Sequence, residues 1–306
     1  MKRLALAIIL TATVVALASS PIILSSLSSL YYTRNPIDNL FRTSWIELEA
    51  FYRPLEESQS YQNVSLTFRL PFNYFTAAIT ASYGGENLLD EVQNNEIDWE
   101  SEVKNVKLFA NVAAQLSAFV VAITTPPFNV DFEDSSVRLI DRTVKIALGL
   151  GNVKLDADYK SYVSKLVKKG GAALYYIKDD LLYIDSTGAT PNTDVDWLNA
   201  KAGLLADAVG YDGRVVLDLG LNLQGIKILQ SNEVDEEIST EEILKYLYAT
   251  LEIEGDPLII GATYDNSGFL LSGGLSLFGA LKSWVEVVFD HEFNMQGIGA
   301  FAQLHF

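Results

Sequence analysis

The chain has no cysteine and only two histidines among its 306 residues. Without cysteine it cannot form a disulfide scaffold or a thiolate metal site, and it cannot carry a lipid-modified cysteine after an export signal. Basic residues are also few, because 22 Lys and Arg stand against 39 Asp and Glu. A net charge of -17 argues against nucleic-acid binding, which requires a basic patch.

Short catalytic motifs are absent as well. The sequence contains no G-x-S-x-G, Walker loop, H-E-x-x-H or EF-hand spacing. Neither His291 nor His305 lies near a distinctive serine motif, and we interpret each as an interfacial or strand-filling residue. We therefore expect no enzymatic activity, no bound metal and no cofactor.

The N-terminus has the pattern of an export signal. Residues 1–3 (MKR) are basic at positions 2 and 3, residues 4–17 are almost continuously apolar, and Ala16-Leu17-Ala18 is a small-x-small cleavage site. This predicts a signal peptide over residues 1–18, cleaved after about Ala18. The alternative is an uncleaved membrane anchor, for which the apolar run is shorter than the roughly 20 residues that a spanning helix needs.

After this signal, no apolar run is long enough for a membrane helix, and apolar residues instead recur at every second position. Examples are the runs 64–72, 144–150 and 198–208. Many runs approach the roughly 9–11 residues that a tilted strand needs to cross a bilayer, whereas strands of soluble proteins average about 5–6. Residues 44–306 are therefore predicted to form an all-β, transmembrane, antiparallel up-and-down barrel of about 14 strands (12–16).

Turn signals separate these runs. Tyr211-Asp212-Gly213-Arg214 marks the clearest hairpin, and Gly151-Asn152 predicts another. Further turns are predicted near Gly255-Asp256-Pro257 and at Asp265-Asn266-Ser267-Gly268.

Residues 103–124 are ambiguous between a hairpin, one long strand and a helix. We prefer strand, with one face running from Val106 to Val120. The polar stretches 84–101 and 231–242 are predicted to be loops on one rim, the second opening on a capping box. Residues 159–171 contain helical spacing that predicts a loop or plug helix, with strand continuation as the alternative.

The alternation also assigns the two faces of the wall. A Lys or Arg on the lipid face costs roughly 2–4 kcal/mol near the midplane, so the charged parity is predicted to face the lumen. The predicted lumen-lining residues are Glu47, Glu49, Arg69, Lys107, Lys145, Lys154, Asp156, Asp158, Lys201, Asp207, Asp218, Asn222, Glu252, Glu254, Lys282, Glu286 and Asp290. Charges of both signs suit a hydrated pore, and the acidic excess predicts a mild preference for cations. Alternatively, these charges pair with one another and fill a closed interior.

Aromatic residues near predicted strand ends are typical of the girdles that barrels place at membrane interfaces. These residues are Trp45, Tyr52, Tyr74, Tyr83, Trp197, Tyr211, Trp284 and Phe306.

The last strand resembles the C-terminal assembly signal of outer-membrane β-barrel proteins. The residues that carry this resemblance are Ile298, Ala300, Ala302, Leu304 and the terminal Phe306. That family usually has an aromatic residue where this chain has Leu304. The resemblance implies an outer-membrane location and recognition by the barrel-assembly machinery.

Asn35-Pro36-Ile37-Asp38-Asn39-Leu40 is similar to the Asn-Pro-Ala segment of the long-chain fatty-acid transporter superfamily, with Ile37 where that family has Ala. Members of that family are 14-stranded barrels with an N-terminal plug. The resemblance implies that residues 19–43 form a possible plug.

From these patterns we expect a porin-like outer-membrane channel for the passive passage of small solutes or ions. The alternatives are a plugged transporter for hydrophobic compounds, a non-conducting structural barrel, or a soluble exported β-protein. The expected partners are the lipid bilayer, the assembly machinery and small solutes or ions. Nucleic acid is not expected, and an oligomer is possible.

Overall fold

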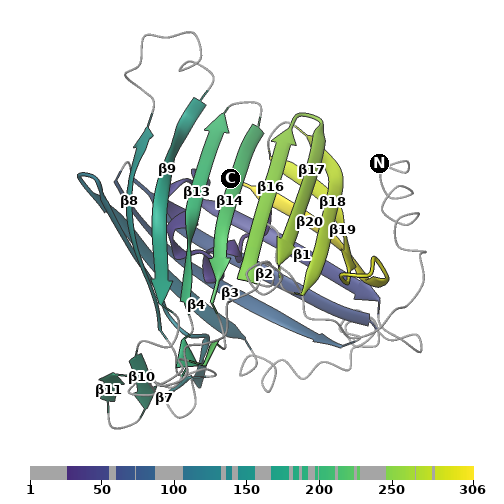
Figure 1. Cartoon of the computed structure of the whole chain (residues 1–306). Helices are drawn as coiled ribbons and strands as arrows, with labels where there is room; N and C mark the ends of the chain where they lie inside the picture. The colour runs from purple at the N-terminus through teal and green to yellow at the C-terminus, as the bar shows by residue number, and fades with distance from the viewer. Residues whose placement is uncertain are drawn as a thin grey trace, which may run out of the picture.

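The computed structural model describes residues 26–54, 60–72, 74–86, 106–131, 136–139, 144–155, 167–178, 182–185, 188–191, 197–198, 200–210, 213–223, 226–227, 246–265, 267–277 and 280–306. Within these residues the chain forms a closed, antiparallel, up-and-down β-barrel (Figure 1). The prediction of an all-β barrel with about 14 strands is confirmed.

Fourteen strands form the wall. They are β1 (Ile46–Pro54), β2 (Ser60–Pro71), β3 (Phe75–Glu86), β4 (Lys107–Leu116), β5 (Phe119–Thr124), β8 (Lys145–Leu155), β9 (Val167–Lys178), β13 (Ala200–Gly210), β14 (Gly213–Asn222), β16 (Leu247–Gly255), β17 (Leu258–Asp265), β18 (Gly268–Leu277), β19 (Leu281–Phe289) and β20 (Met295–His305). Each pairs with its neighbours along the chain, and β1 pairs with β20 to close the ring.

Three short ribbons supplement the fourteen wall strands, and one of them joins the wall sheet where Phe128 pairs with Leu108 of β4. Strands β6 (Phe128–Asp131) and β7 (Ser136–Leu139) form one, and β10 (Leu182–Asp185) and β11 (Gly188–Pro191) form another. Strands β12 (Trp197–Leu198) and β15 (Ile226–Lys227) form the third. No helix in the described parts of the chain is long and apolar enough to cross a membrane.

Burial alternates along the wall strands, as a pleated strand with two different faces requires. In β17, Leu258 and Ile260 are about half exposed, whereas Ile259 and Thr263 are buried. Other outward positions hold large apolar side chains, including Leu148, Leu150, Phe119, Leu174, Leu251 and Leu275. The wall therefore has an apolar outer face, and its charged side chains point inward.

The two rims of the barrel differ in the length of their connections. At one rim, which we call the short-turn rim, most connections are short, such as 117–118, 211–212 and 256–257, and the longest there is the stretch 156–166 between β8 and β9. At the other, the long-loop rim, the connections 87–106, 125–144, 179–199 and 223–246 are much longer. The C-terminus of the chain and the start of β1 lie together at the short-turn rim, where the Phe306 amide donates to the carbonyl of Ile46 at 2.9 Å.

Several predicted turns are confirmed. β13 and β14 pair antiparallel up to Val209 and Arg214, as the predicted hairpin requires, and β16 and β17 each pair with the strand that follows them across the predicted turns. Residues 107–124 form the hairpin β4–β5, so strand was the correct preference. The predicted single face was wrong: Ser117 has a φ of 62° in a two-residue turn, and Val120 points inward while Val112 points outward.

Two other predictions were wrong. There is no hairpin at Gly151-Asn152, because β8 continues through both residues while paired with β9. Trp284 is no interface residue: its ring is buried inside the barrel, stacked on Phe301 with 4.7 Å between the ring centroids. The alternation of apolar residues looks the same within one long strand and across a tight turn between two strands, so it cannot distinguish the two.

Some predictions fall outside the described residues. They are residues 159–166 of the predicted loop helix, the capping box at residues 239–242, residues 87–101 and 231–242 of the polar stretches, and the aromatic residues Trp197 (side chain) and Tyr211. The described ends of two of these stretches contradict the prediction, because residues 167–171 belong to β9, as the alternative of strand continuation had it, and residues 84–86 belong to β3.

Candidate functional site: the occupied lumen

The lumen contains the part of the chain that precedes the first strand. Residues 26–43, here called the inner segment, form two short 3-10 helices, η1 (Tyr31–Thr33) and η2 (Pro36–Leu40), enclosed by the wall (Figure 1). Asn35 and Pro36 start η2, because the Asn35 side chain accepts a hydrogen bond from the Ile37 amide at 3.2 Å and proline suits the first helical position. This short helix turns its apolar residues toward one side of the barrel.

That side of the wall carries an apolar patch on its inner face. We call the apolar side chains on the inward faces of β4, β5, β8, β9, β13 and β14 the apolar half, and Lys169, Lys201, Asp207, Arg214 and Asp218 point inward from the same strands. Its buried members are Ala113, Val120, Ala122, Ala147, Ala173, Tyr175, Ile177, Leu205 and Val216, and Tyr248 of β16 adjoins them. Ile37, Leu40 and Phe41 of the inner segment pack against this surface and are fully buried. Burial of each such side chain contributes roughly 1.5–3 kcal/mol, so this contact is a substantial part of what holds the segment.

The opposite side of the lumen is lined by charged and hydroxyl side chains. We call the inward faces of β16 to β20 and β1 to β3 the polar half. Its buried polar members include Glu47, Glu49, Ser65, Thr67, Arg69, Thr76, Thr80, Ser82, Thr250, Glu252, Glu254, Thr263, Ser272, Ser276, Lys282, Glu286 and Gln303.

Residues 26–29 of the inner segment bind the polar half. The Ser26 amide donates to Glu252 at 3.0 Å, and its hydroxyl donates to the other oxygen of the same carboxylate. The Ser28 hydroxyl and the Ser29 amide each donate to Glu49 at 2.8 Å. The hydroxyls of Ser29 and Ser65 lie 3.2 Å apart. Three of the first four residues of the segment are thus tied to carboxylates on β1 and β16.

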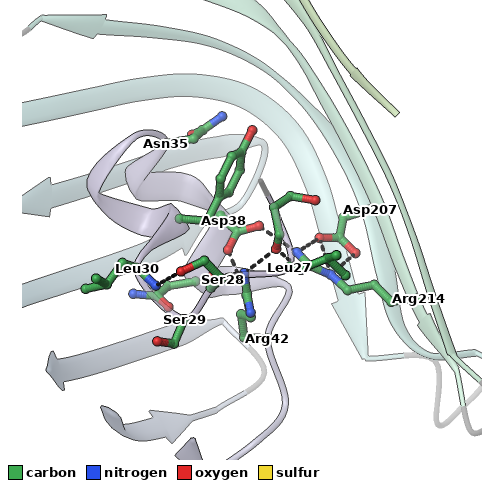
Figure 2. Close-up of polar contacts among 12 residues, drawn as sticks. Leu27, Ser28, Ser29, Leu30, Asn35, Asp38, Arg42, Asp207 and Arg214 are labelled. Atoms are coloured by element: carbon green, nitrogen blue, oxygen red, sulfur yellow. Dashed lines mark hydrogen bonds and ion pairs between the residues drawn. The ribbon is translucent and has the colours of Figure 1, made fainter. Parts of the chain in front are cut away.

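A network of buried ions joins the inner segment to the wall (Figure 2). Asp38 accepts from Arg42 at 2.8 Å and from Arg214 of β14 at 2.6 Å, each through a different carboxylate oxygen. Arg214 also pairs with Asp207 of β13. The two guanidinium groups further donate to the carbonyl of Ser26, at 2.7 Å from Arg42 and 3.0 Å from Arg214.

These charges keep Asp38 ionised. Burial by itself raises the pKa of Asp38, but the positive charges of Arg42 and Arg214 outweigh that effect and hold the pKa below its ordinary value. A buried charge that loses its partner is strongly destabilising, at about 3–5 kcal/mol. Displacement of the inner segment therefore separates Asp38 from Arg214, and it requires another partner or water to replace that contact.

Asp218 of β14 is the second polar attachment point of the segment. Its carboxylate is fully buried and accepts from two residues of the segment, the Tyr31 hydroxyl at 2.7 Å and the Asn35 amide at 3.1 Å. It also accepts from two wall residues, Tyr175 of β9 at 2.5 Å and Tyr248 of β16 at 3.1 Å. Burial and the Asp218 charge raise the pKa of Tyr31, so its hydroxyl remains a donor.

A third group of contacts lies at Glu47 of β1. Arg69 of β2 binds the two oxygens of Glu47 at 2.9 and 3.0 Å and also donates to Asn39 of the inner segment at 3.0 Å. Asn39 in turn donates to Asn111 of β4 at 2.8 Å. The inner segment is therefore fastened to strands on every side of the lumen.

The residues predicted to line the lumen divide into three groups. Ten are buried within the barrel, namely Glu47, Glu49, Arg69, Lys201, Asp207, Asp218, Glu252, Glu254, Lys282 and Glu286. Four lie at or beyond strand ends on the long-loop rim, namely Lys107, Lys145, Asn222 and Asp290. Asp156, Asp158 and the side chain of Lys154 lie outside the described residues.

Asp290 belongs to the turn between β19 and β20 and does not line the lumen interior. It accepts hydrogen bonds from the side chain and backbone of Asn294, from Gln296 and from the Glu292 amide, and together these lower its pKa. The neighbouring His291 is exposed and contacts the edges of Tyr264 and Phe269. His305 points inward and lies 3.6 Å from Glu47.

Sequence reasoning missed the wall residues that hold the inner segment. Arg214 was assigned to a turn, although it shares the inward parity of Val216 and Asp218 and could have been found by extending the alternation. Tyr248 shares the inward parity of Glu252 and Glu254, but no local pattern indicates that it and Tyr175 meet the same carboxylate, because their strands lie far apart in the sequence.

In the last strand, the side chains of Ala302, Leu304 and Phe306 are exposed on the outer face, and those of Ile298 and Ala300 are partly exposed there. Gln303 points inward and donates to Glu49 at 3.0 Å. β20 therefore contributes to both the apolar exterior and the contacts of the polar half.

No protein-family model matches the chain, and no curated protein matches it. Solved structures to which it is similar include one titled for the asymmetric conductivity of engineered proteins, and a mutant of the porin of Rhodopseudomonas blastica. For both, sequence identity is 12%, the TM-score is 0.34, and the match covers 85% of this chain and 99% of the other. Because these TM-scores are far below 0.5, this likeness carries no argument about cargo or mechanism.

The fold and the lumen define a class of protein nonetheless. The chain is a β-barrel with an apolar exterior whose interior is occupied by the segment that precedes its first strand.

Proposed function

We propose that this chain is an exported outer-membrane transporter whose lumen is closed by its own inner segment. The observation that carries the proposal is the filling of the lumen: Ile37, Leu40 and Phe41 cover the apolar half, while Asp38 and Arg42 form a buried ion network with the wall. Transport requires that the segment move.

The apolar exterior supports a place in a membrane. Leu148, Leu174 and Ile260 each leave about half of the side chain exposed, which is costly in water and favourable in lipid. The proposal includes cleavage of residues 1–18 during export and recognition of the last strand, ending in Phe306, by the barrel-assembly machinery. We propose no catalytic role for the chain.

The cargo that the wall favours is hydrophobic, because the inward side chains that pack on Ile37, Leu40 and Phe41 form a continuous apolar patch. A second candidate is porin-like passive passage of small solutes or ions with a mild preference for cations. The polar half favours it, since Glu49, Glu252 and Glu286 point into the lumen there. Both candidates share the movement of the inner segment.

A reversible disulfide tests that movement. Ser29 of the segment and Ser65 of β2 have hydroxyls 3.2 Å apart, so the double variant Ser29→Cys/Ser65→Cys places two thiols at bonding range in a chain without other cysteines. The matched control is Thr250→Cys/Thr263→Cys, whose hydroxyls are also 3.2 Å apart but join two wall strands.

The measurement is uptake of the hydrophobic dye N-phenyl-1-naphthylamine by Gram-negative cells that carry each variant in the outer membrane. We expect oxidation of the Ser29–Ser65 pair to reduce uptake to that of cells without the protein, and reduction to restore it. The control pair should give the same uptake in both redox states. Equal uptake by the oxidised and reduced Ser29–Ser65 variant would falsify gating by the inner segment.

A further inference from the structure

The hydrogen bonds that the inner segment donates to Asp218 indicate which kind of ligand can bind this carboxylate. Two of the four donors to this carboxylate, the hydroxyl of Tyr31 and the amide of Asn35, leave the site if the segment moves. Tyr175 and Tyr248 belong to the wall and remain. A carboxylate that loses two hydrogen bonds must replace them with donors from water or from a ligand.

The apolar half is continuous with this carboxylate. Tyr175 and Tyr248 donate to Asp218 and also belong to the apolar cluster that includes Leu205 and Val216. Val216 precedes Asp218 by two residues on the inward face of β14. An apolar body that replaces Ile37, Leu40 and Phe41 therefore lies beside a carboxylate that requires a donor.

The charges around Asp218 favour a neutral donor. Lys201 of β13 remains in the wall, with its ammonium 4.4 Å from the centre of the Tyr248 ring, and its charge acts on Asp218. Arg34, which is 6.0 Å from the same ring, belongs to the inner segment and departs with it. Lys201 thus offsets the negative charge of Asp218 after the segment is displaced, so a ligand does not need a positive charge. A carboxylate on the ligand would lie next to Asp218 and be repelled by it.

We infer that Asp218, with Tyr175 and Tyr248, is a recognition site for an uncharged hydroxyl or amide group carried on an apolar molecule, and that the inner segment imitates this ligand. The inference rests on the proposed function, because the site is vacant only when the segment is displaced. It names the class of cargo as hydroxylated amphiphiles and excludes apolar carboxylates.

The test compares two probes that differ only in the head group, 4-octylphenol and 4-octylbenzoate. Equilibrium binding of each radiolabelled probe is measured on the purified full-length protein in detergent at pH 7.5, with the detergent background subtracted. At this pH the phenol is neutral, since its pKa is about 10, and the benzoate is anionic. The wild type is expected to prefer the phenol by about tenfold or more, the factor for one hydrogen bond to a charged group.

Three variants separate recognition from release of the segment. Asp218→Asn also removes an attachment of the inner segment, which raises the affinity for both probes by the same factor. The ratio of the two affinities is therefore unaffected by this release. We expect the phenol-to-benzoate ratio to fall toward one. In Tyr31→Phe both affinities should rise and the ratio should persist, because only the competing donor is lost. Glu49→Gln, which weakens another attachment of the segment, should likewise leave the ratio unchanged.

Equal binding of the two probes to the wild type, or an unchanged affinity ratio in Asp218→Asn, overturns the assignment of this recognition site. Gating by the inner segment is judged separately, by the dye-uptake measurement. Absence of phenol binding even in Tyr31→Phe overturns the assignment as well. Undiminished phenol binding to the oxidised Ser29→Cys/Ser65→Cys variant overturns the claim that the segment covers the site. Failure of the proposed function itself is recognised separately, by dye uptake that does not respond to the disulfide.

Discussion

The two halves of the lumen wall hold the same segment by different means. The apolar half binds Ile37, Leu40 and Phe41 through burial, which is non-directional and tolerates a different occupant of similar volume. The polar half binds Ser26 and Ser28 through hydrogen bonds to carboxylates, which require donors at fixed positions. The difference indicates that the apolar half sets how strongly the segment is held, and the polar half sets where it sits.

The largest expected effect comes from removing the segment altogether. A variant lacking residues 26–42 keeps all fourteen wall strands and should conduct ions steadily in planar bilayers, where the wild type is mostly closed. Because Glu49, Glu252 and Glu286 then face water, the reversal potential in a salt gradient should indicate a mild preference for cations. Heat-dependent migration on gels checks that the barrel still forms. A folded variant that is closed, or that prefers anions, contradicts our account of the polar half.

A smaller effect is expected from Phe41→Ala in the apolar half. Truncation of a buried phenylalanine costs about 3–5 kcal/mol, so the segment should leave the lumen at least a hundredfold more often. The reporter is Ser29→Cys, nearly fully buried in the described structure, whose labelling by a polar thiol reagent requires displacement. If labelling accelerates less than tenfold, the apolar half is not the main holding surface.

The smallest effect is expected from Ser28→Ala in the polar half, measured with the same reporter. The lost hydroxyl donates to Glu49, which keeps its hydrogen bonds from Ser29 and Gln303. One hydrogen bond to a charged group contributes about 1.5–3 kcal/mol. Because Glu49 keeps two other donors, we expect a loss at the low end of this range, which accelerates labelling roughly tenfold. An effect that exceeds that of Phe41→Ala would reverse the ranking of the two halves.

The sequence predicts the wall well because the wall repeats a simple rule. The alternation around Leu217, Leu219 and Asp218 gives strand, face and hairpin from local residues alone. It fails at Gly151 and Val120, where a continuing strand and a tight turn leave similar alternating patterns.

The contents of the lumen could not be predicted in the same way. The two-residue alternation indicates which side chains point into the lumen, but not which residues they contact there. Asp218 contacts Tyr31 across 187 positions of the sequence, and no local pattern encodes such a pair. The Asn35-Pro36 pair was the one local hint, since it marks the start of the short helix that carries Ile37 and Leu40.

The seam between β1 and β20 has a consequence for the order of assembly. The inner segment connects directly to β1, yet Ser26 binds Glu252, 226 positions away, and the carbonyl of Leu27 accepts from Gln303, 276 positions away. Such distant contacts cannot form until the last strand has been made, and contacts of long sequence separation form slowly. The beginning of the chain therefore reaches its final contacts only after the end of the chain has been made.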